Sequence, residues 1–198
     1  MVCIVSRTGR HLQKYSKGRR LVVGCIPYRF KNGNHDIYDD DYELEVLVVS
    51  SQKGQKMMFP KGGWELDESV EEAASRESLE EAGVVGHVQV SNRTFLKCSG
   101  KLNGSYIIQH RINLNFNRDV IFMVQHELGT WCYKSKSRDI YHEGYMFPLL
   151  VTEQLELWPE KNSRQRVWMT VEEAKEVCDA SWMKEALDRL VDRLSASG

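Results

Sequence analysis

The stretch that decides the fold is GGWELDESVEEAASRESLEEAGV, residues 62–84. Near its end, Glu77, Glu80 and Glu81 stand at i, i+3 and i+4. Residues at these spacings are neighbours on one face of a helix, so three like charges would crowd together at some energetic cost. A solvated acidic face would explain them, and so would a metal site, because Mg²⁺ prefers clustered carboxylate oxygens. The spacing of the three glutamates alone leaves both interpretations open.

The longer stretch favours the metal site. A glycine is followed after five residues by Glu, and after seven more by Arg-Glu-x-x-Glu-Glu-x-Gly. This pattern resembles the Nudix box, the signature of the Nudix hydrolases, and it departs at Ser78, where the family has an aliphatic residue. We expect that change to alter local packing rather than metal binding. The matching positions are Gly62, Glu68, Arg76, Glu77, Glu80, Glu81 and Gly83.

The resemblance implies structural roles for four of these residues. Gly62 would let the loop backbone approach the substrate and turn into the helix. Glu68 and Arg76 would form the pair that joins loop to helix. Gly83 stands where a left-handed cap would end the helix.

The resemblance also implies the chemistry. Glu77, Glu80 and Glu81 would bind one or more Mg²⁺ or Mn²⁺ ions, which bridge a diphosphate and lower the pKa of a bound water. One glutamate would act as general base, and we favour Glu81 over Glu80. Glu143, just before a strand, is a further candidate ligand, although it is also one surface glutamate among many.

The sequence on either side of the box indicates which branch of the Nudix family the chain resembles. Residues 46–65 and 154–174 are similar to the diphosphoinositol polyphosphate and diadenosine polyphosphate phosphohydrolases, especially the plant members. In that branch, residues around the metal site bind a ligand crowded with phosphates, where arginine offers paired donors and lysine a point charge. Each cation alone could equally be an ordinary exposed side chain. The predicted substrate-binding residues are Arg19, Arg20, Ser50, Ser51, Lys61, Gly62, Gly63, Lys134, Lys136, Arg138, Arg164 and Arg166. Lys61 departs from the Gly-rich loop of the animal enzymes in this branch. Their substrate preference therefore cannot simply be transferred to this chain.

The pattern of apolar residues predicts alternating elements. Strands are expected at 21–30, 44–51 and 144–155, with Pro148 favouring an edge or a bulge. A helix is expected at 68–82, and Thr170 with Glu173 forms a capping box that begins a later helical stretch. The fold class is α/β, a Nudix-type α/β/α sandwich with a mixed sheet.

Residues 1–198 are expected to form a single Nudix domain, with about 18–194 as its folded body. Residues 90–125 do not fit the family, and they are rich in Asn, Ile and Phe. Codons for Val90-Ser91 can spell a splice donor, and Gln125 an acceptor. Our hypothesis is that this segment is a translated intron or a recent insertion. The alternative is that it is an ordinary functional loop. Transcripts lacking these codons would support the intron, whereas their absence and genomic ends other than GT and AG would refute it.

Composition limits the partners and the compartment. A formal net charge of −1 gives no case for a nucleic-acid polymer or a membrane surface, and no apolar run is long enough to span a bilayer. Five scattered cysteines indicate reduced thiols in an intracellular compartment. The stretch before Asp36 is basic and lacks acids, which is compatible with import into a chloroplast or mitochondrion, the cytosol being the alternative.

The sequence therefore predicts a divalent-metal-dependent hydrolase with a phosphorylated small-molecule substrate. It would cleave a diphosphate linkage in nucleoside diphosphate derivatives, dinucleoside polyphosphates or diphosphoinositol polyphosphates. The alternative is a non-catalytic domain that binds a phosphorylated ligand in the same pocket.

Overall fold

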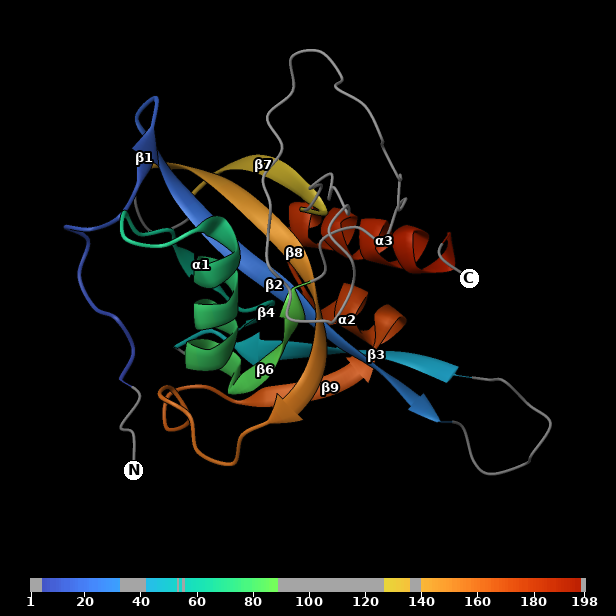
Figure 1. The fold of residues 1–198 in the computed structure, drawn as a ribbon. Helices are drawn as coiled ribbons and strands as arrows, with labels where there is room; N and C mark the ends of the chain where they lie inside the picture. Colours follow the sequence, from blue (N-terminus) through green and yellow to red (C-terminus); the bar gives the residue numbers. More distant parts are fainter. Residues whose placement is uncertain are drawn as a thin grey trace, which may run out of the picture. The chain divides into compact units, whose positions relative to one another are not determined.

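Two long strands form the middle of a mixed sheet in the computed structural model, which describes residues 5–32, 42–52, 54, 56–88, 127–135 and 140–196 (Figure 1). Strands β2 (Arg19–Asn32) and β8 (Tyr141–Gln154) run parallel, from the pair Arg20–His142 to the pair Tyr28–Leu150. Strand β3 (Tyr42–Ser50) is antiparallel to β2. Both pairings occur in one sheet, as predicted.

The other strands pair with this framework. Strands β6 (Val84–Val88) and β7 (Gly129–Lys134) lie antiparallel to successive parts of β8. The short strands β1 (Tyr15–Ser16) and β5 (Lys61–Gly63) pair with β2. Strands β4 (Met57–Met58) and β9 (Arg166–Thr170) pair with β3. Strand β5 matters for function, because it carries the first residues of the box into the sheet.

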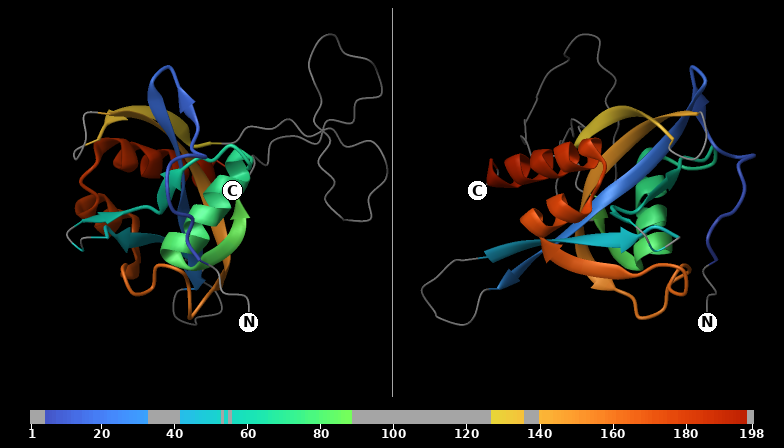
Figure 2. Two further views of the ribbon diagram at one scale, coloured as in Figure 1. Left: turned by 90° about the vertical axis from the view of Figure 1, so that its left-hand side faces the viewer. Right: turned by 180° about the vertical axis from the view of Figure 1, so that it is seen from behind.

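Side chains alternate between the two faces of the sheet, and each face is covered by helices. Val23 and Cys25 lie in one apolar cluster with residues of α1 (Val70–Glu77) and of the π-helical turn η1 (Ser78–Ala82). Ile26 and Tyr28 lie in a second cluster with α2 (Val171–Val177) and α3 (Ser181–Ser195). Figures 1 and 2 show α1 on one side of the sheet and α2 and α3 on the other. The predicted α/β/α sandwich is confirmed.

The box helix begins and ends with specific caps. Ser69 and Glu72 form a capping box, so α1 begins at Val70, two residues after the predicted start. The last turn widens into η1, where the Ser78 hydroxyl donates to the carbonyl of Ala74 at 3.0 Å. This bond satisfies the polar side chain that replaces an aliphatic one. Gly83 ends the helix at φ +62°, the predicted left-handed cap.

The expectation of an edge strand or bulge at Pro148 is wrong. Strand β8 is an inner strand, with β2 along one side and β7 and then β6 along the other. Pro148 lies between Met146, which pairs with β7, and Leu149, which pairs with β6. Pro148 pairs with Ile26 in the parallel ladder, but neither antiparallel ladder on the other side of β8 includes it, so its missing N–H costs no ladder bond on that side. The capping box at Thr170 is present as predicted.

Two further points concern the predictions for the whole chain. The segment 90–125 lies outside the described residues. Among the described residues, no helix combines the length and apolar character needed to cross a membrane.

Replacing Gly83 by alanine is expected to destabilise the fold by roughly 1–3 kcal/mol, because a side chain there is strained and also crowded. A Cβ at Gly83 would lie 2.6 Å from Cγ of Trp158. Urea unfolding measures the loss. Gly18→Ala is the control, since Gly18 shares the positive φ but has nothing within 4 Å of an added Cβ. Equal losses in both variants would show that contact with Trp158 is unimportant.

Candidate active site

Gly62 lies against a carboxylate of the acidic helix. It pairs with Val23 through β5, and a Cβ built on it would lie 2.2 Å from both side-chain oxygens of Glu77. A glycine is therefore required by the close approach of Glu77. This is a structural reason in addition to the predicted approach to substrate.

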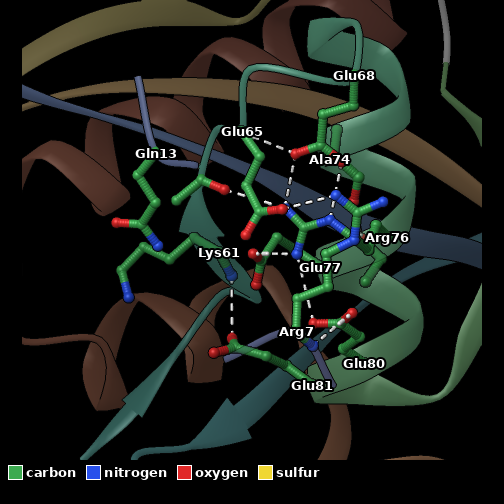
Figure 3. Close-up of polar contacts among 12 residues, drawn as sticks. Arg7, Gln13, Lys61, Glu65, Glu68, Ala74, Arg76, Glu77, Glu80 and Glu81 are labelled. Carbon is green, nitrogen blue, oxygen red and sulfur yellow. Dashed lines mark hydrogen bonds and ion pairs between the residues drawn. The ribbon is translucent and has the colours of Figure 1, made fainter. Parts of the chain in front are cut away.

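Arg76 joins the loop to the helix. Its Nε and Nη2 donate to the two oxygens of Glu68, each at 2.8 Å, and Nη2 also donates to the carbonyl of Gly63 at 2.9 Å. Its Nη1 donates to Glu77 at 2.6 Å and to Glu80 at 3.3 Å (Figure 3). The predicted contact between Glu68 and Arg76 is thus a two-pronged pair, which is the strong geometry for this interaction.

The three glutamates of the acidic turn are buried. Their exposed fractions are 7% for Glu77, 5% for Glu80 and 6% for Glu81. Burial raises the pKa of Glu77 to about 8; Arg76 opposes this rise, and the charges of Glu81 and Glu80 add to it. Burial also raises the pKa values of Glu80 and Glu81. The alternative of a solvated acidic face does not hold here.

Backbone donors complete the cluster. Oε2 of Glu81 accepts the N–H of Lys61 at 3.0 Å, and Oε1 accepts from Nη2 of Arg164. Oε1 of Glu80 accepts the N–H of Arg7 at 3.2 Å. Figure 3 shows the carboxylate of Glu81 facing the backbone nitrogen of Lys61.

The donor set of this cluster fits a hard divalent cation. Its three side chains offer only carboxylate oxygens, and the charges of Glu81 and Glu80 raise the pKa of Glu77, an effect that a bound cation would oppose. In the part of the chain that the structure describes, no three acidic, histidine or cysteine side chains converge on one metal position. Arg76 and Arg164 hold the carboxylates instead. A metal could therefore use an oxygen that an arginine now binds only if that oxygen left the arginine.

Two of the predicted substrate-binding cations lie beside the cluster. Lys61 is half-buried, its Nζ lies 3.2 Å from Sδ of Met58, and burial lowers its pKa. Arg20 donates from Nε to Gln13 at 2.5 Å. Burial lowers the Arg20 pKa, and the nearby charge of Arg10 lowers it further. Crowded cations of this kind are stabilised by a bound polyanion.

Other predicted residues lie in different surroundings. Arg19 donates to Sγ of Cys132 at 2.8 Å and lies 3.4 Å from Glu143, so the candidate ligand Glu143 is paired with a cation. Lys134 lies 6.0 Å from the ring centre of Tyr141. Lys136 and Arg138 lie outside the described residues.

The serines and Gly63 have structural contacts. The hydroxyl of Ser50 accepts the N–H of Gln165 at 3.0 Å. The Ser51 N–H donates to the carbonyl of Lys56 at 2.7 Å. A Cβ on Gly63 would lie 2.4 Å from Nε2 of Gln13, so this glycine also permits a close approach.

Arg166 binds main-chain carbonyls, a set of contacts that the sequence did not predict. Its guanidinium donates to Ala82 at 2.8 Å, Gly83 at 3.1 Å and Leu155 at 2.6 Å, and it lies 3.9 Å from the ring centre of Trp158. Its donors cap the end of the box helix, which favours a structural role over the predicted contact with substrate.

Sequence reasoning missed several residues of the site. Arg7 donates to Glu65 at 2.6 Å and to Asp67 at 2.9 Å, which binds the start of the chain to the box loop. Glu160 accepts from Arg164 at 2.6 Å. Arg7 lies so far from Glu65 in the sequence that no spacing connects them, and only the excess of basic residues near Arg7 hinted at such a partner. Glu160 and Arg164 stand at i and i+4, but that spacing predicts a pair only on a helix, and no helix was expected there.

The chain combines a sandwich fold with a helical turn of buried glutamates, next to a loop that contains two glycines. This is the arrangement of an enzyme that hydrolyses phosphoanhydrides. The NUDIX domain model matches residues 19–190. The chain belongs to the Nudix hydrolase family and is a pyrophosphohydrolase. Members of this family generally need divalent metal ions and act on nucleoside diphosphate derivatives.

Relatives and solved structures agree with this assignment. Mitochondrial Nudix hydrolase 17 of Arabidopsis thaliana is 56% identical over 196 residues, which cover 99% of this chain and 87% of that protein. Mitochondrial Nudix hydrolase 18 of the same plant is 54% identical, covering 98% and 89%. The binary complex of a C. elegans Ap4A hydrolase has a TM-score of 0.55 at 17% identity, covering 89% of this chain and 98% of that one. The structural likeness concerns the fold alone.

Glu68→Gln is expected to lower the free energy of unfolding by roughly 1–3 kcal/mol at neutral pH. Burial by itself would raise the pKa of Glu68, but hydrogen bonds from Arg76 and the Glu65 N–H lower it overall. A lowered pKa means that the pair stabilises the fold above about pH 4 and loses this effect as pH falls through the folded-state pKa. Urea unfolding from pH 7 to pH 3 tests this. A difference between wild type and variant that does not shrink in acid would contradict it.

Proposed function

We propose that this chain hydrolyses a diphosphate linkage in dinucleoside polyphosphates or diphosphoinositol polyphosphates, with Mg²⁺ or Mn²⁺ bound by Glu77, Glu80 and Glu81. One observation carries the proposal: these three glutamates are buried together on one helical turn, beside the buried Arg164 and the half-buried Lys61. Burying like charges side by side opposes folding, and a divalent ion offsets that cost.

The bound ion and the side chains around it have different roles in the proposed reaction. A bound ion supplies charge neutralisation at phosphorus and an acidified water. Arg76 orients Glu77 and Glu80 through contacts that it shares with Glu68. Glu81, held at Oε2 by the N–H of Lys61, takes a proton from the attacking water. Its raised pKa suits a general base that works near neutral pH.

The cations beside the cluster support a substrate with several phosphates. Burial lowers the pKa values of both Lys61 and Arg20. The charge of Arg20 lowers the pKa of Lys61 further, and the charge of Arg10 lowers that of Arg20. A polyphosphate chain would neutralise them. Among structurally similar proteins, one is an Ap4A hydrolase and another, a Nudix domain of Shewanella oneidensis NrtR, is complexed with ADP ribose (TM-score 0.52, 17% identity).

The location that we propose is inside the cell, in the mitochondrion. Two close relatives carry mitochondrial names, and the basic, acid-free start of the chain is of the kind used for import. A chloroplast is the alternative, as in the name of Nudix hydrolase 21, which is 44% identical. A fluorescent fusion of the full chain imaged in plant cells distinguishes the two organelles from the cytosol.

A substrate panel tests the activity. Purified protein with Mg²⁺ or Mn²⁺ is expected to release phosphate-containing products from at least one nucleoside diphosphate derivative, dinucleoside polyphosphate or diphosphoinositol polyphosphate. Glu80→Gln and Glu81→Gln should each lower turnover about 10²-fold or more, because they remove a charged ligand or a base. Circular dichroism should show the fold retained.

Glu71→Gln is the matched control, since it removes one negative charge from α1 outside the acidic turn. Its turnover should equal that of the wild type. No turnover of any compound, combined with tight ligand binding that neither Glu80→Gln nor Glu81→Gln weakens, would favour the non-catalytic binding domain.

A further inference from the structure

Arg164 links three parts of the chain through one buried guanidinium. It lies between β8 and β9, and its exposed fraction is 8%. Its Nε donates to Oε2 of Glu160 at 2.6 Å, and its Nη1 donates to the carbonyl of Ser50 at 2.8 Å. Its Nη2 donates to Oε1 of Glu81. The side chain therefore joins its own loop, the end of β3 and the acidic turn.

The backbone around Arg164 fixes this position. The N–H of Glu160 donates to the carbonyl of Glu80 at 3.1 Å, which attaches the loop to the box helix. The N–H of Arg164 donates to the carbonyl of Glu160 at 2.9 Å. On the other side, Gln165 and Ser50 exchange two hydrogen bonds, of 2.8 and 3.0 Å. A guanidinium held from both sides differs from the substrate-binding residue that the sequence predicted, and also from its alternative, an ordinary exposed cation.

Both oxygens of Glu81 have a donor. Oε2 accepts from the N–H of Lys61, and Oε1 is paired with Arg164. Glu77 and Glu80 share Arg76 instead. Two arginines thus divide the acidic turn between them, and Arg164 serves Glu81 alone among its three glutamates.

We propose that Arg164 is a positioning residue, which fixes the carboxylate of Glu81 and withholds its Oε1 from the metal, and that Glu160 and Ser50 hold Arg164 in place for this purpose. The inference rests on the proposed function, in which Glu81 is a metal ligand and general base. Arginine can reach three partners at once with a planar fork, whereas lysine is a point charge on a flexible stem. Charge and geometry can therefore be tested separately.

Arg164→Gln removes both the charge and the fork. Its affinity for Mn²⁺, measured by electron paramagnetic resonance titration, should rise about threefold or more, because a positive charge that repels the ion is gone. Its kcat should nevertheless fall about tenfold or more, with KM within about twofold of the wild type, because Glu81 is no longer held in position. A residue that merely supported the fold would weaken metal binding and turnover together.

Arg164→Lys keeps the charge and loses the fork. Its Mn²⁺ affinity should match that of the wild type within about twofold. Its kcat should fall as in Arg164→Gln, and its KM should stay close to that of the wild type. Lys161→Gln is the control for charge: Lys161 is exposed in the same loop and donates to the carbonyl of Glu156 at 2.7 Å. It should change neither quantity. If the Gln variant does not fold in thermal melts, the kinetics of the Lys variant decide.

Three results would overturn the inference. KM raised about tenfold with kcat retained in Arg164→Lys would make Arg164 a phosphate-binding residue instead. Weaker Mn²⁺ binding in a folded Arg164→Gln would show that the arginine does not compete with the metal. Wild-type values in both variants would show that Arg164 does not position Glu81.

The proposed function can fail separately. A wild type that cleaves nothing but binds Mn²⁺ would refute the activity, and the comparison of Mn²⁺ affinities would still test Arg164. If the wild type cleaves compounds of the panel and the Arg164 variants match its kinetics and its Mn²⁺ affinity, the inference alone is refuted. A wild type that binds no Mn²⁺ would refute the metal site on which both depend.

Discussion

The interaction on which the site depends is the contact of one guanidinium, that of Arg76, with both the loop and the helix. Its fork holds Glu68 from the loop, its Nη2 binds the carbonyl of Gly63, and its Nη1 faces Glu77 and Glu80. A buried carboxylate without a partner costs several kcal/mol, so these acids could not be buried here without a cation. The loop and the helix are therefore fixed by the same charge that makes the acidic cluster tolerable.

Repulsion among the carboxylates remains after this pairing. Burial is the largest cause of the raised pKa of Glu77, and the negative charges of Glu81 and Glu80 raise it further although Arg76 opposes them. This repulsion is what a divalent ion would offset. The structure explains in this way why a protein would bury acids in a region whose main role is not stability.

The sequence predicted the parts of the site that depend on fixed spacing. The box residues were identifiable because each stands at a set distance from the next along a loop and a helix. Contacts between distant segments, such as that of Arg7 with Glu65, left no such pattern. Glu160 and Arg164 stand only four residues apart, but they lie in a loop, where that spacing does not predict a contact. Arg166 was difficult for another reason, because a guanidinium suits phosphate oxygens and helix-end carbonyls equally well, and only the fold decides between them.

The same distinction explains one detail of the fold that the sequence did not predict and one that it predicted wrongly. The widened turn at Ser78 and the position of Pro148 depend on what lies beside the chain: the carbonyl of Ala74 for the serine, and the gap between two ladders for the proline. A single-residue preference cannot express either neighbour.

The two box glycines show how much structure a fixed spacing can contain. Gly62 leaves room for the carboxylate of Glu77, whereas Gly83 combines a left-handed backbone with contact against Trp158. The first glycine brings the loop onto the acidic turn, and the second ends the helix directly after that turn. Arg166, which binds the carbonyls of Ala82 and Gly83, then connects this end to β9. The residues between the glycines thus have little freedom in register, because a shift by one position would move Glu77 away from Gly62 and leave the buried acids without Arg76.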